Sequence, residues 1–267
     1  MNANTVRRGI TIAVLCATAA LGLVACDDSG DTSAKATSGG AGSGSSPSAA
    51  PKPTTPSPTP PALAQLSADE IVHKATDAMT STRSLTADMT GEEDGKPTTF
   101  HLSLDSKGEC TGHLTEGSAN VEIISTRTHF YMRGNDAFLK QMGDGTVQLL
   151  HGKWMKTAAT SSTAKEMSSF CDLDELLSGF KEKAHRPTKG ALSTLDGRRV
   201  IPVSDKDPKD GSTSTAYIAA DDTPYVLKIV TVGGDDAGTL LFGDFDKPVS
   251  ATAPPAGQVV DIDKLGS

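Results

Sequence analysis

The feature that most limits what this chain can fold into is a long low-complexity stretch from Asp27 to about Ala64. Its first part is mostly Gly, Ser, Ala and Thr, and seven prolines follow between Pro47 and Pro61. Such a composition buries too little apolar surface to offset the entropy lost on ordering. We therefore expect a tether, flexible in its Gly/Ser half and stiffer in its Pro/Thr half, followed by one folded domain at 66–267.

The residues before this stretch have the three parts of an export signal. Arg7 and Arg8 precede an apolar segment of about 15 residues, shorter than the roughly 20 that a membrane span needs. The segment ends in Leu-Val-Ala-Cys at 23–26, a lipobox in which the thiol of Cys26 takes a diacylglyceryl group before cleavage. We predict a signal peptide at 1–25 and a lipidated N-terminus and tether at 26–65. The alternative is an ordinary signal peptide with a chance cysteine.

The expected address is the extracytoplasmic face of a cell membrane, where acyl chains on Cys26, palmitate among them, hold the protein. The chain has a formal net charge of −8, which becomes −10 when Arg7 and Arg8 leave with the signal. An acidic chain without a basic stripe excludes nucleic acid as a partner. It also argues against electrostatic docking on anionic lipid head groups.

Two cysteines, Cys110 and Cys171, remain once Cys16 leaves with the signal and Cys26 is lipidated. An even pair in an exported domain favours a disulfide. The pair is 61 positions apart. Closing that loop in the unfolded chain would stabilise the fold by about 4 kcal/mol on the chain-entropy model. Two buried thiols, or half of a metal site, are the alternatives.

Two helices are predicted from capping residues and from apolar residues at helical spacing. The first begins with a capping box of Ser67 and Glu70. The second begins at its expected N-cap, Asp172, and is a substantial helix that ends at Arg186 and Pro187. Its expected apolar face consists of Leu173, Leu176, Leu177 and Phe180.

Segments in which apolar and polar residues alternate fill the rest of the domain, separated by turns rich in Gly, Asp and Pro. They predict roughly nine to eleven antiparallel strands, and the segment at 135–142 is compatible with either a helix or a strand. The expected class is therefore α+β, with helices packed on one side of a curved antiparallel sheet.

Several short pieces have the order and spacing of a known superfamily. They are Gly-Glu-Cys-Thr-Gly at 108–112, Tyr-Met-Arg-Gly-Asn-Asp-Ala-Phe at 131–138, Gly-Lys-Trp-Met-Lys at 152–156, Ser-Phe-Cys-Asp at 169–172, Phe-Asp-Lys-Pro-Val at 245–249, and Ala-Pro-Pro at 253–255 with Val-Val-Asp at 259–261. On these pieces the domain resembles the LolA-like superfamily of LppX/LprG-type lipoproteins. The resemblance implies a half-barrel sheet whose helices lie on the concave face over an apolar cavity. It also implies carriage of acylated lipids, lipoglycans or lipoproteins between membranes.

Two functions are compatible with these patterns. The first is a carrier of a hydrophobic ligand, such as a lipid or lipoglycan. The residues that could line its cavity, or equally form a closed core, are Leu102, Leu104, Phe130, Met132, Leu173, Leu177, Phe180 and Phe242. The second is a tethered envelope sensor or interaction module that binds a protein partner without a lipid, because a tether raises effective concentration. A continuous apolar pocket above roughly 300 Å³ would favour the carrier, and a filled interior with an exposed apolar patch would favour the module.

Catalytic and metal motifs are missing from the domain sequence. It contains neither Gly-x-Ser-x-Gly nor His-Glu-x-x-His, so we expect no enzyme, no catalytic residue and no cofactor. His101, His113 and His129 fall on separate expected strands and could meet in space. Solvent-facing strand histidines are the plainer interpretation, and we expect no metal site. The Asp-rich segment at 205–211 departs from a calcium loop, whose twelfth position would be Ala216 here.

Overall fold

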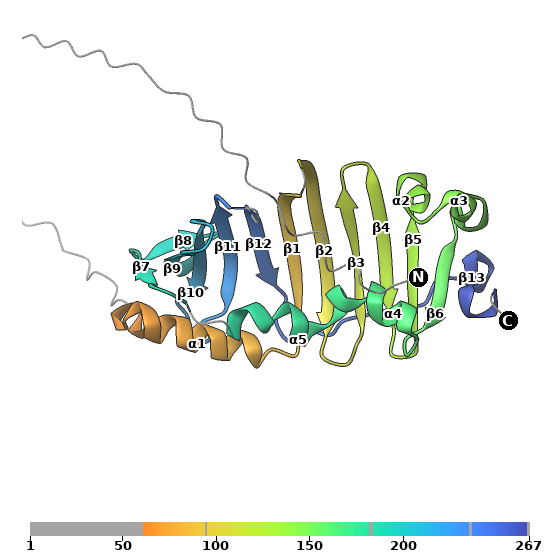
Figure 1. Ribbon diagram of the computed structural model, residues 1–267. Coiled ribbons are helices and arrows are strands. Elements are labelled where there is room, and N and C mark those ends of the chain that lie inside the picture. Colours follow the sequence, from red (N-terminus) through yellow and green to blue (C-terminus); the bar gives the residue numbers. More distant parts are fainter. Residues whose placement is uncertain (1–60, 94, 182–183, 235–236, 266–267) are drawn as a thin grey trace, which may run out of the picture. The chain divides into compact units, whose positions relative to one another are not determined.

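A computed structural model of the protein describes residues 61–93, 95–181, 184–234 and 237–265 (Figure 1). The chain divides into two compact units, Met1–Thr55 and Pro56–Ser267, and the described residues all lie in the second. The predicted signal peptide, Cys26 and the tether as far as residue 60 lie outside the described residues. No helix in the described part of the chain is long and apolar enough to cross a membrane.

One large sheet of 13 strands dominates the described unit. The strands are β1 (Ser84–Glu93), β2 (Lys96–Asp105), β3 (Cys110–Glu116), β4 (Ala119–Ser125), β5 (His129–Gly134), β6 (Trp154–Ala158), β7 (Thr188–Lys189), β8 (Ser193–Leu195), β9 (Arg198–Lys206), β10 (Thr213–Ala219), β11 (Val226–Val232), β12 (Gly238–Gly243) and β13 (Val259–Asp261). Their order is β13-β6-β5-β4-β3-β2-β1-β12-β11-β10-β9-β7, with β8 also paired to β9. The strand pairs are antiparallel apart from β13, which runs parallel to β6.

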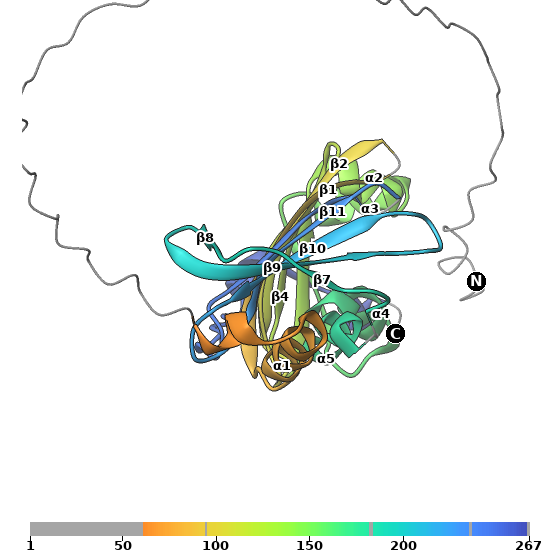
Figure 2. The same cartoon turned by 90° about the vertical axis from the view of Figure 1, so that its left-hand side faces the viewer.

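The helical segments are short apart from the first. They are α1 (Ala68–Thr80), α2 (Asp136–Gln141), α3 (Asp144–Leu150), α4 (Ser162–Met167), α5 (Leu173–Leu176) and the 3-10 turns η1 (Ala62–Gln65), η2 (Ser169–Cys171), η3 (Ser178–Lys181), η4 (Ala256–Gln258) and η5 (Ile262–Lys264). Figure 1 shows α1, α5 and α4 crossing in front of the lower part of the strands, and Figure 2 shows them from the side on one face of the curved sheet. We call α1, α5 and η3 the cover, and the face under it the concave face. The predicted α+β half-barrel is confirmed.

The start of the folded part and the first helix follow from local sequence. The capping box of α1 is formed as predicted: the Glu70 N–H donates to Ser67 Oγ at 3.3 Å, and the Ser67 N–H donates to Glu70 Oε2 at 2.9 Å. These bonds satisfy amides that a helix start leaves free. Residues 62–65, expected in the tether, form η1 with Leu63 buried. Folded structure therefore begins slightly before Leu66.

The substantial second helix predicted after residue 172 is wrong. Asp172 is the N-cap as predicted, because its carboxylate accepts two backbone N–H groups of the first turn, at 2.9 and 3.2 Å. The α-helix nevertheless ends at Leu176 after 4 residues, and the chain continues as the 3-10 turn η3. Ser178 and Gly179 follow at once, and glycine lowers helix stability by about 1 kcal/mol relative to alanine. A single α-helical turn is therefore followed by a 3-10 turn.

The C-terminal residues lie on the other face of the sheet. After β12, the chain passes behind the strands and reaches the far edge as β13 (Figure 1). There the Asp263 carboxylate accepts hydrogen bonds from Thr157 Oγ1 at 2.7 Å and from the Ala158 N–H at 2.8 Å. Lys156 Nζ pairs with Asp261 Oδ2 at 3.0 Å. These contacts cover the edge of β6, which would otherwise present unpaired backbone groups.

Candidate functional site

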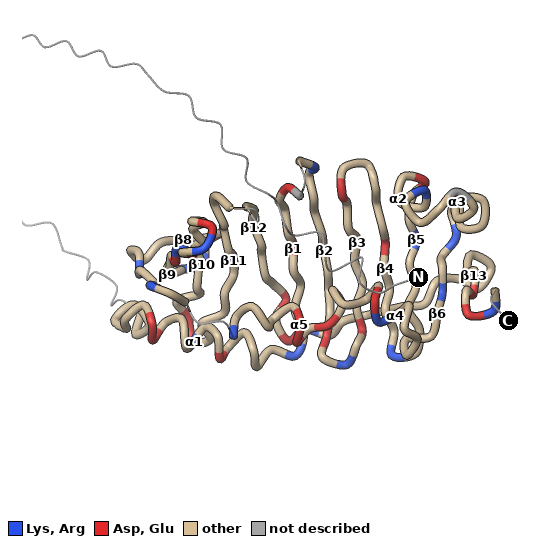
Figure 3. Tube along the Cα trace, viewed as in Figure 1, with Lys and Arg blue, Asp and Glu red and all other residues tan. Residues whose placement is uncertain are grey.

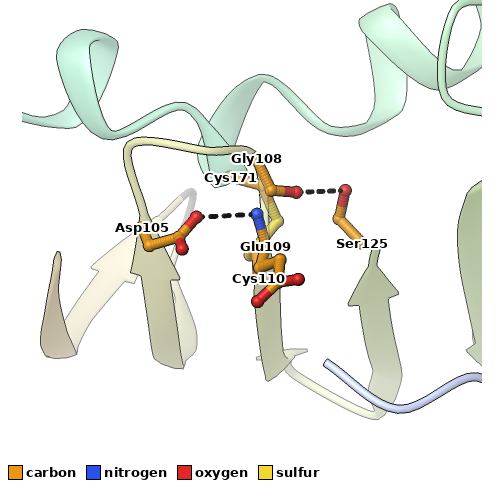
Figure 4. The surroundings of a disulfide bond; sticks show 6 residues. All are labelled: Asp105, Gly108, Glu109, Cys110, Ser125 and Cys171. Atoms are coloured by element: carbon orange, nitrogen blue, oxygen red, sulfur yellow. Dashed lines mark hydrogen bonds between the residues drawn. A yellow bond between two sulfur atoms is a disulfide. The ribbon is translucent and has the colours of Figure 1, made fainter. Parts of the chain in front are cut away.

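A disulfide joins the helical segments to the sheet. Cys110 at the start of β3 and Cys171 at the end of η2 are bonded, with their Cα atoms 5.7 Å apart, and both are buried (Figure 4). In the turn before β3, the Asp105 carboxylate accepts the Glu109 N–H at 2.9 Å. The structure thus decides between the alternatives that the sequence left open for this pair.

The two helical parts of the cover also contact each other and the sheet. Thr76 Oγ1 on α1 donates to the Phe180 carbonyl oxygen at 3.2 Å. The Phe180 ring lies 5.6 Å from the Phe242 ring on β12, centroid to centroid. These contacts link η3 to α1 and to β12, which are both far from it in sequence.

Beyond η3, Asp205 on β9 fixes the returning chain. Its carboxylate accepts the backbone N–H groups of His185 and Arg186, each at 2.8 Å, and lies 3.5 Å from His185 Nδ1. Burial raises the pKa of Asp205, but these hydrogen bonds favour the charged form and together leave its pKa below the ordinary value. The ionised carboxylate therefore favours the folded arrangement.

Two rows of residues on the concave face lie under the cover. Residues opposite each other on neighbouring strands, and every second residue along one strand, share a face of a sheet. The first row consists of Leu85, Leu104, Cys110, Ser125, Phe130 and Thr157. The second consists of Phe242, Ala87, Leu102, Gly112, Ile123, Met132 and Met155. We call these the covered rows.

The eight residues proposed from sequence for a cavity are all brought together here. Five lie in the covered rows and three in the cover: Leu102, Leu104, Phe130, Met132 and Phe242, and Leu173, Leu177 and Phe180. Phe180 is half-buried, and the others are at most 6% exposed and belong to one core cluster. Their side chains pack against one another in this structure, and their role in lining a ligand cavity stays a prediction.

A third apolar row lies on the same face, farther from the cover. It consists of Ile229, Leu240, Met89, Phe100, Leu114 and Val121, one residue on each of six adjacent strands. We call it the upper row. Val121 is 9% exposed, and the other five side chains are half-buried. With strands about 4.8 Å apart, five spacings give a row roughly 24 Å long.

Two glycines lie next to the upper row, on the side away from the covered rows. Gly91 on β1 lies opposite Gly238 on β12. Gly91 is two residues from Met89 and Gly238 is two residues from Leu240, so both glycines lie on the same face as the upper row. A Cβ added to Gly238 would lie 2.8 Å from the Thr90 carbonyl oxygen, so the strands approach closely there. The glycines add no side chain that would shield the apolar row.

Helix α2 closes one end of the upper row. Gly134 lies opposite Val121, and Phe138 of α2 packs so tightly over Gly134 that a Cβ there would overlap the ring. Asn135 caps α2 by accepting the Phe138 N–H at 3.0 Å. The segment at 135–142, ambiguous in sequence, is therefore helical.

Most charged residues lie at strand ends, in turns and on helices (Figure 3).

Three depressions lie elsewhere on the surface. One of about 610 Å³ adjoins the disulfide and is lined by charged residues such as Lys107, Arg127 and Asp174. A second, of about 580 Å³, lies near Asn135. A third, of about 600 Å³, lies on the convex face beside His113. Each is open and lined by polar as well as apolar groups, unlike the continuous apolar pocket considered in the sequence analysis.

Two of the three strand histidines meet on the convex face. The rings of His101 and His113 stack with centroids 5.5 Å apart, whereas the His129 ring lies beside Tyr131. Within the described ranges, no three or more His, Cys, Asp or Glu side chains form a set able to hold a metal ion. In the loop once compared with a calcium site, Asp207 accepts a backbone N–H at 2.7 Å, as in a polar turn.

Comparisons with known proteins found similar chains among solved structures. No protein-family pattern and no curated protein matches this chain. Among solved structures, lipoprotein LppX of Mycobacterium tuberculosis is 16% identical, with 68% of this chain and 97% of that chain covered and a TM-score of 0.45. LprF of Mycobacterium bovis is 14% identical over 71% of this chain and 97% of its own, with a TM-score of 0.48. The MucA/MucB complex of Pseudomonas aeruginosa matches at 13% identity over 72% of this chain and 59% of that chain, with a TM-score of 0.32.

The class of fold rests on the sheet and the cover of this chain itself, which form an open antiparallel half-barrel with helices on one face.

Proposed function

We propose that this protein binds a hydrophobic ligand with a long apolar chain along the upper row of its concave face. The observation that carries the proposal is the row itself: six apolar residues in register on adjacent strands, five of them half-buried. The interior beneath the cover is filled with side chains, so a ligand would lie on this partly exposed row and not in an enclosed cavity. Contiguous apolar surfaces mark ligand-binding grooves as well as protein contact sites.

The geometry of the row suits an extended chain. A ligand lying across the strands would cover apolar side chains over roughly 24 Å. Each Å² of apolar surface removed from water contributes about 25 cal/mol, so contact along the whole row gives affinity without any charged group. The resemblance adds that the ligand is a lipid or lipoglycan, and we propose carriage of it by binding rather than by catalysis.

The location is part of the same proposal. We propose a lipid anchor on Cys26, with the residues up to about 60 as a tether that lets the domain reach a ligand away from its own membrane. The lipobox at 23–26 supports the anchor. Growth of the producing cells with an alkyne analogue of palmitate should label the wild-type protein and leave Cys26→Ala unlabelled. Equal labelling of both would contradict the anchor.

The ligand site is tested by two neighbouring leucines on β12. Leu240 belongs to the upper row, whereas Leu241 points to the opposite face and is 39% exposed. In a titration with a fluorescent fatty acid, Leu240→Gln should weaken binding about tenfold, which corresponds to roughly 1.4 kcal/mol. Leu241→Gln should stay within about twofold of wild type, because that side chain would not touch the ligand. A wild-type protein that binds no acyl probe, or equal losses in both variants, would overturn the proposal.

A protein partner is the second candidate function. Met142 and Leu149, at and near the ends of α2 and α3, are 42% and 47% exposed. The filled core and these exposed apolar side chains together support a protein partner, because apolar patches on a surface also mark protein contact sites. Crosslinking in cells would recover a specific protein with the wild type and lose it with Met142→Gln/Leu149→Gln. Failure to recover such a protein would remove this candidate.

A further inference from the structure

The convex face carries a row of polar residues behind the apolar rows. Asp88, His101, His113, Glu122 and Arg133 lie directly opposite one another on β1, β2, β3, β4 and β5. Directly opposed residues have Cβ atoms about 5 Å apart, so their side chains interact. The two histidines therefore stand side by side between two carboxylates.

Asp88 fixes the orientation and the tautomer of His101. His101 Nδ1 lies 2.6 Å from Asp88 Oδ1. A carboxylate accepts hydrogen bonds, so Nδ1 carries the proton and Nε2 keeps a free lone pair. This is the arrangement in which carboxylates orient metal-binding histidines.

His113 offers the second nitrogen ligand. Its ring stacks on that of His101 with an interplanar angle of 28°, and its side chain is exposed. It also lines the open depression of about 600 Å³ on this face, where Ser250 and Thr252 of the C-terminal segment lie opposite. Imidazole lone pairs lie in the plane of the ring, so a metal ion shared with His101 requires the His113 ring to turn out of this stack.

The carboxylate of Glu122 is paired with Arg133 and not with His113. Both of its carboxylate oxygens accept hydrogen bonds from Arg133 Nη2, at 2.9 and 2.7 Å. The Arg133 guanidinium lies 4.7 Å above the Trp154 ring, which holds it in place. The site therefore has two imidazole ligands from the protein, in keeping with the finding that no set of three metal-binding side chains converges among the described residues.

We propose that His101 and His113 bind a divalent transition-metal ion through two imidazole nitrogens, with water completing the coordination and Asp88 as the positioning residue. Imidazole ligands suit Cu²⁺, Ni²⁺ and Zn²⁺, and Cu²⁺ binds most tightly among divalent first-row ions at a given nitrogen site. The site is separate from the upper row, because it lies on the opposite face of the same strands.

The test is a titration of the full chain in detergent micelles with Cu²⁺ alone, followed by calorimetry and by electron paramagnetic resonance. The wild type should give a signal split by two nitrogens. His101→Gln and His113→Gln should each lose about tenfold or more in affinity, and Asp88→Asn about tenfold, as is usual for residues that orient a ligand. One nitrogen in the wild-type signal, or an unchanged affinity in His113→Gln, would overturn the proposal.

His151 is the matched control. It makes the same kind of pair, with Nδ1 2.7 Å from Asp136 Oδ1, but it lies outside the convex row. His151→Gln should leave Cu²⁺ affinity within about twofold of wild type, and a loss equal to that of His113→Gln would overturn the assignment. His113→Gln should bind the fluorescent fatty acid like wild type, so failure of the metal site and failure of the proposed ligand site are distinguishable.

Discussion

The covered rows and the upper row of the concave face belong to the same strands and differ in what lies over them. Leu104 and Leu102 are at most 1% exposed beneath the cover, whereas Phe100, two residues farther along β2, is half-buried. The alternation of β2 is the same throughout. The difference comes from the cover, which crosses only the lower part of the strands (Figure 1).

This comparison shows how a sheet can supply a core and a candidate binding surface together. A strand of period two presents an apolar face over its whole length. The helices bury only the part of this apolar strand face that they cover. The remaining apolar side chains stay partly exposed to water. The glycines at 91 and 238 preserve this state, because they add no side chain beside the row.

The largest expected effect is loss of the disulfide, which would test how far the cover depends on it. The variant Cys110→Ala/Cys171→Ala should lower the free energy of unfolding by about 4 kcal/mol, because the unfolded chain regains the freedom of the closed loop. Urea unfolding of the variant and the wild type would measure the difference. A loss below about 1 kcal/mol would mean that core packing alone holds the cover in place.

Leucine truncation compares the two regions directly. Leu104→Ala, in the covered rows, should cost about 3 kcal/mol, because buried Leu→Ala changes leave a cavity and lose apolar contact. Leu114→Ala, in the upper row on the adjacent strand, should cost only about 1 kcal/mol, because its side chain already contacts water. Urea midpoints of both variants would provide the values. Equal costs would show that the upper row is as much a part of the core as the covered rows.

The smallest effect concerns pH and the chain that returns to the sheet beyond the cover. The lowered pKa of Asp205 means that its contribution to stability is present above the ordinary carboxyl pKa and is lost as pH falls through the lowered value. Wild-type stability should therefore fall more between pH 7 and pH 3 than that of Asp205→Asn, which has no charge to lose. Urea midpoints of both proteins at the two pH values would measure this difference in stability. Parallel losses in both proteins would contradict this role for the carboxylate.

Local patterns predicted those features whose physical cause is local. The Ser67 capping box and the Asp172 cap depend on atoms within a few residues, and both are present. The length of the second helix was wrong, because weak formers such as Gly179 decide helix length together with packing. The edge strands β7, β8 and β13 were not predicted. They have only 2 or 3 residues each and are defined by their partners.

The candidate sites were harder to predict than the fold. The eight residues that the sequence suggested for a cavity come from strands and from the segment after Cys171, and all but the half-buried Phe180 belong to the buried cluster. Leu114, Leu240 and Ile229 of the upper row were not proposed, because nothing near them in sequence indicates where the cover ends. The meeting of His101 and His113 was considered, but only the register of β2 and β3 places them opposite each other.

The sequence alone predicted the α+β class of the fold. Its low-complexity stretch predicts where the folded unit begins. Its alternating segments and capped helix predict a curved antiparallel sheet with helices on one side, because both patterns have periods of a few residues, and the half-barrel was implied by the resemblance. The tertiary structure decided which cysteines pair, which apolar rows are covered and which histidines meet. These depend on strand register and on the reach of short helices, and a shift of one residue in register would turn each side chain to the other face.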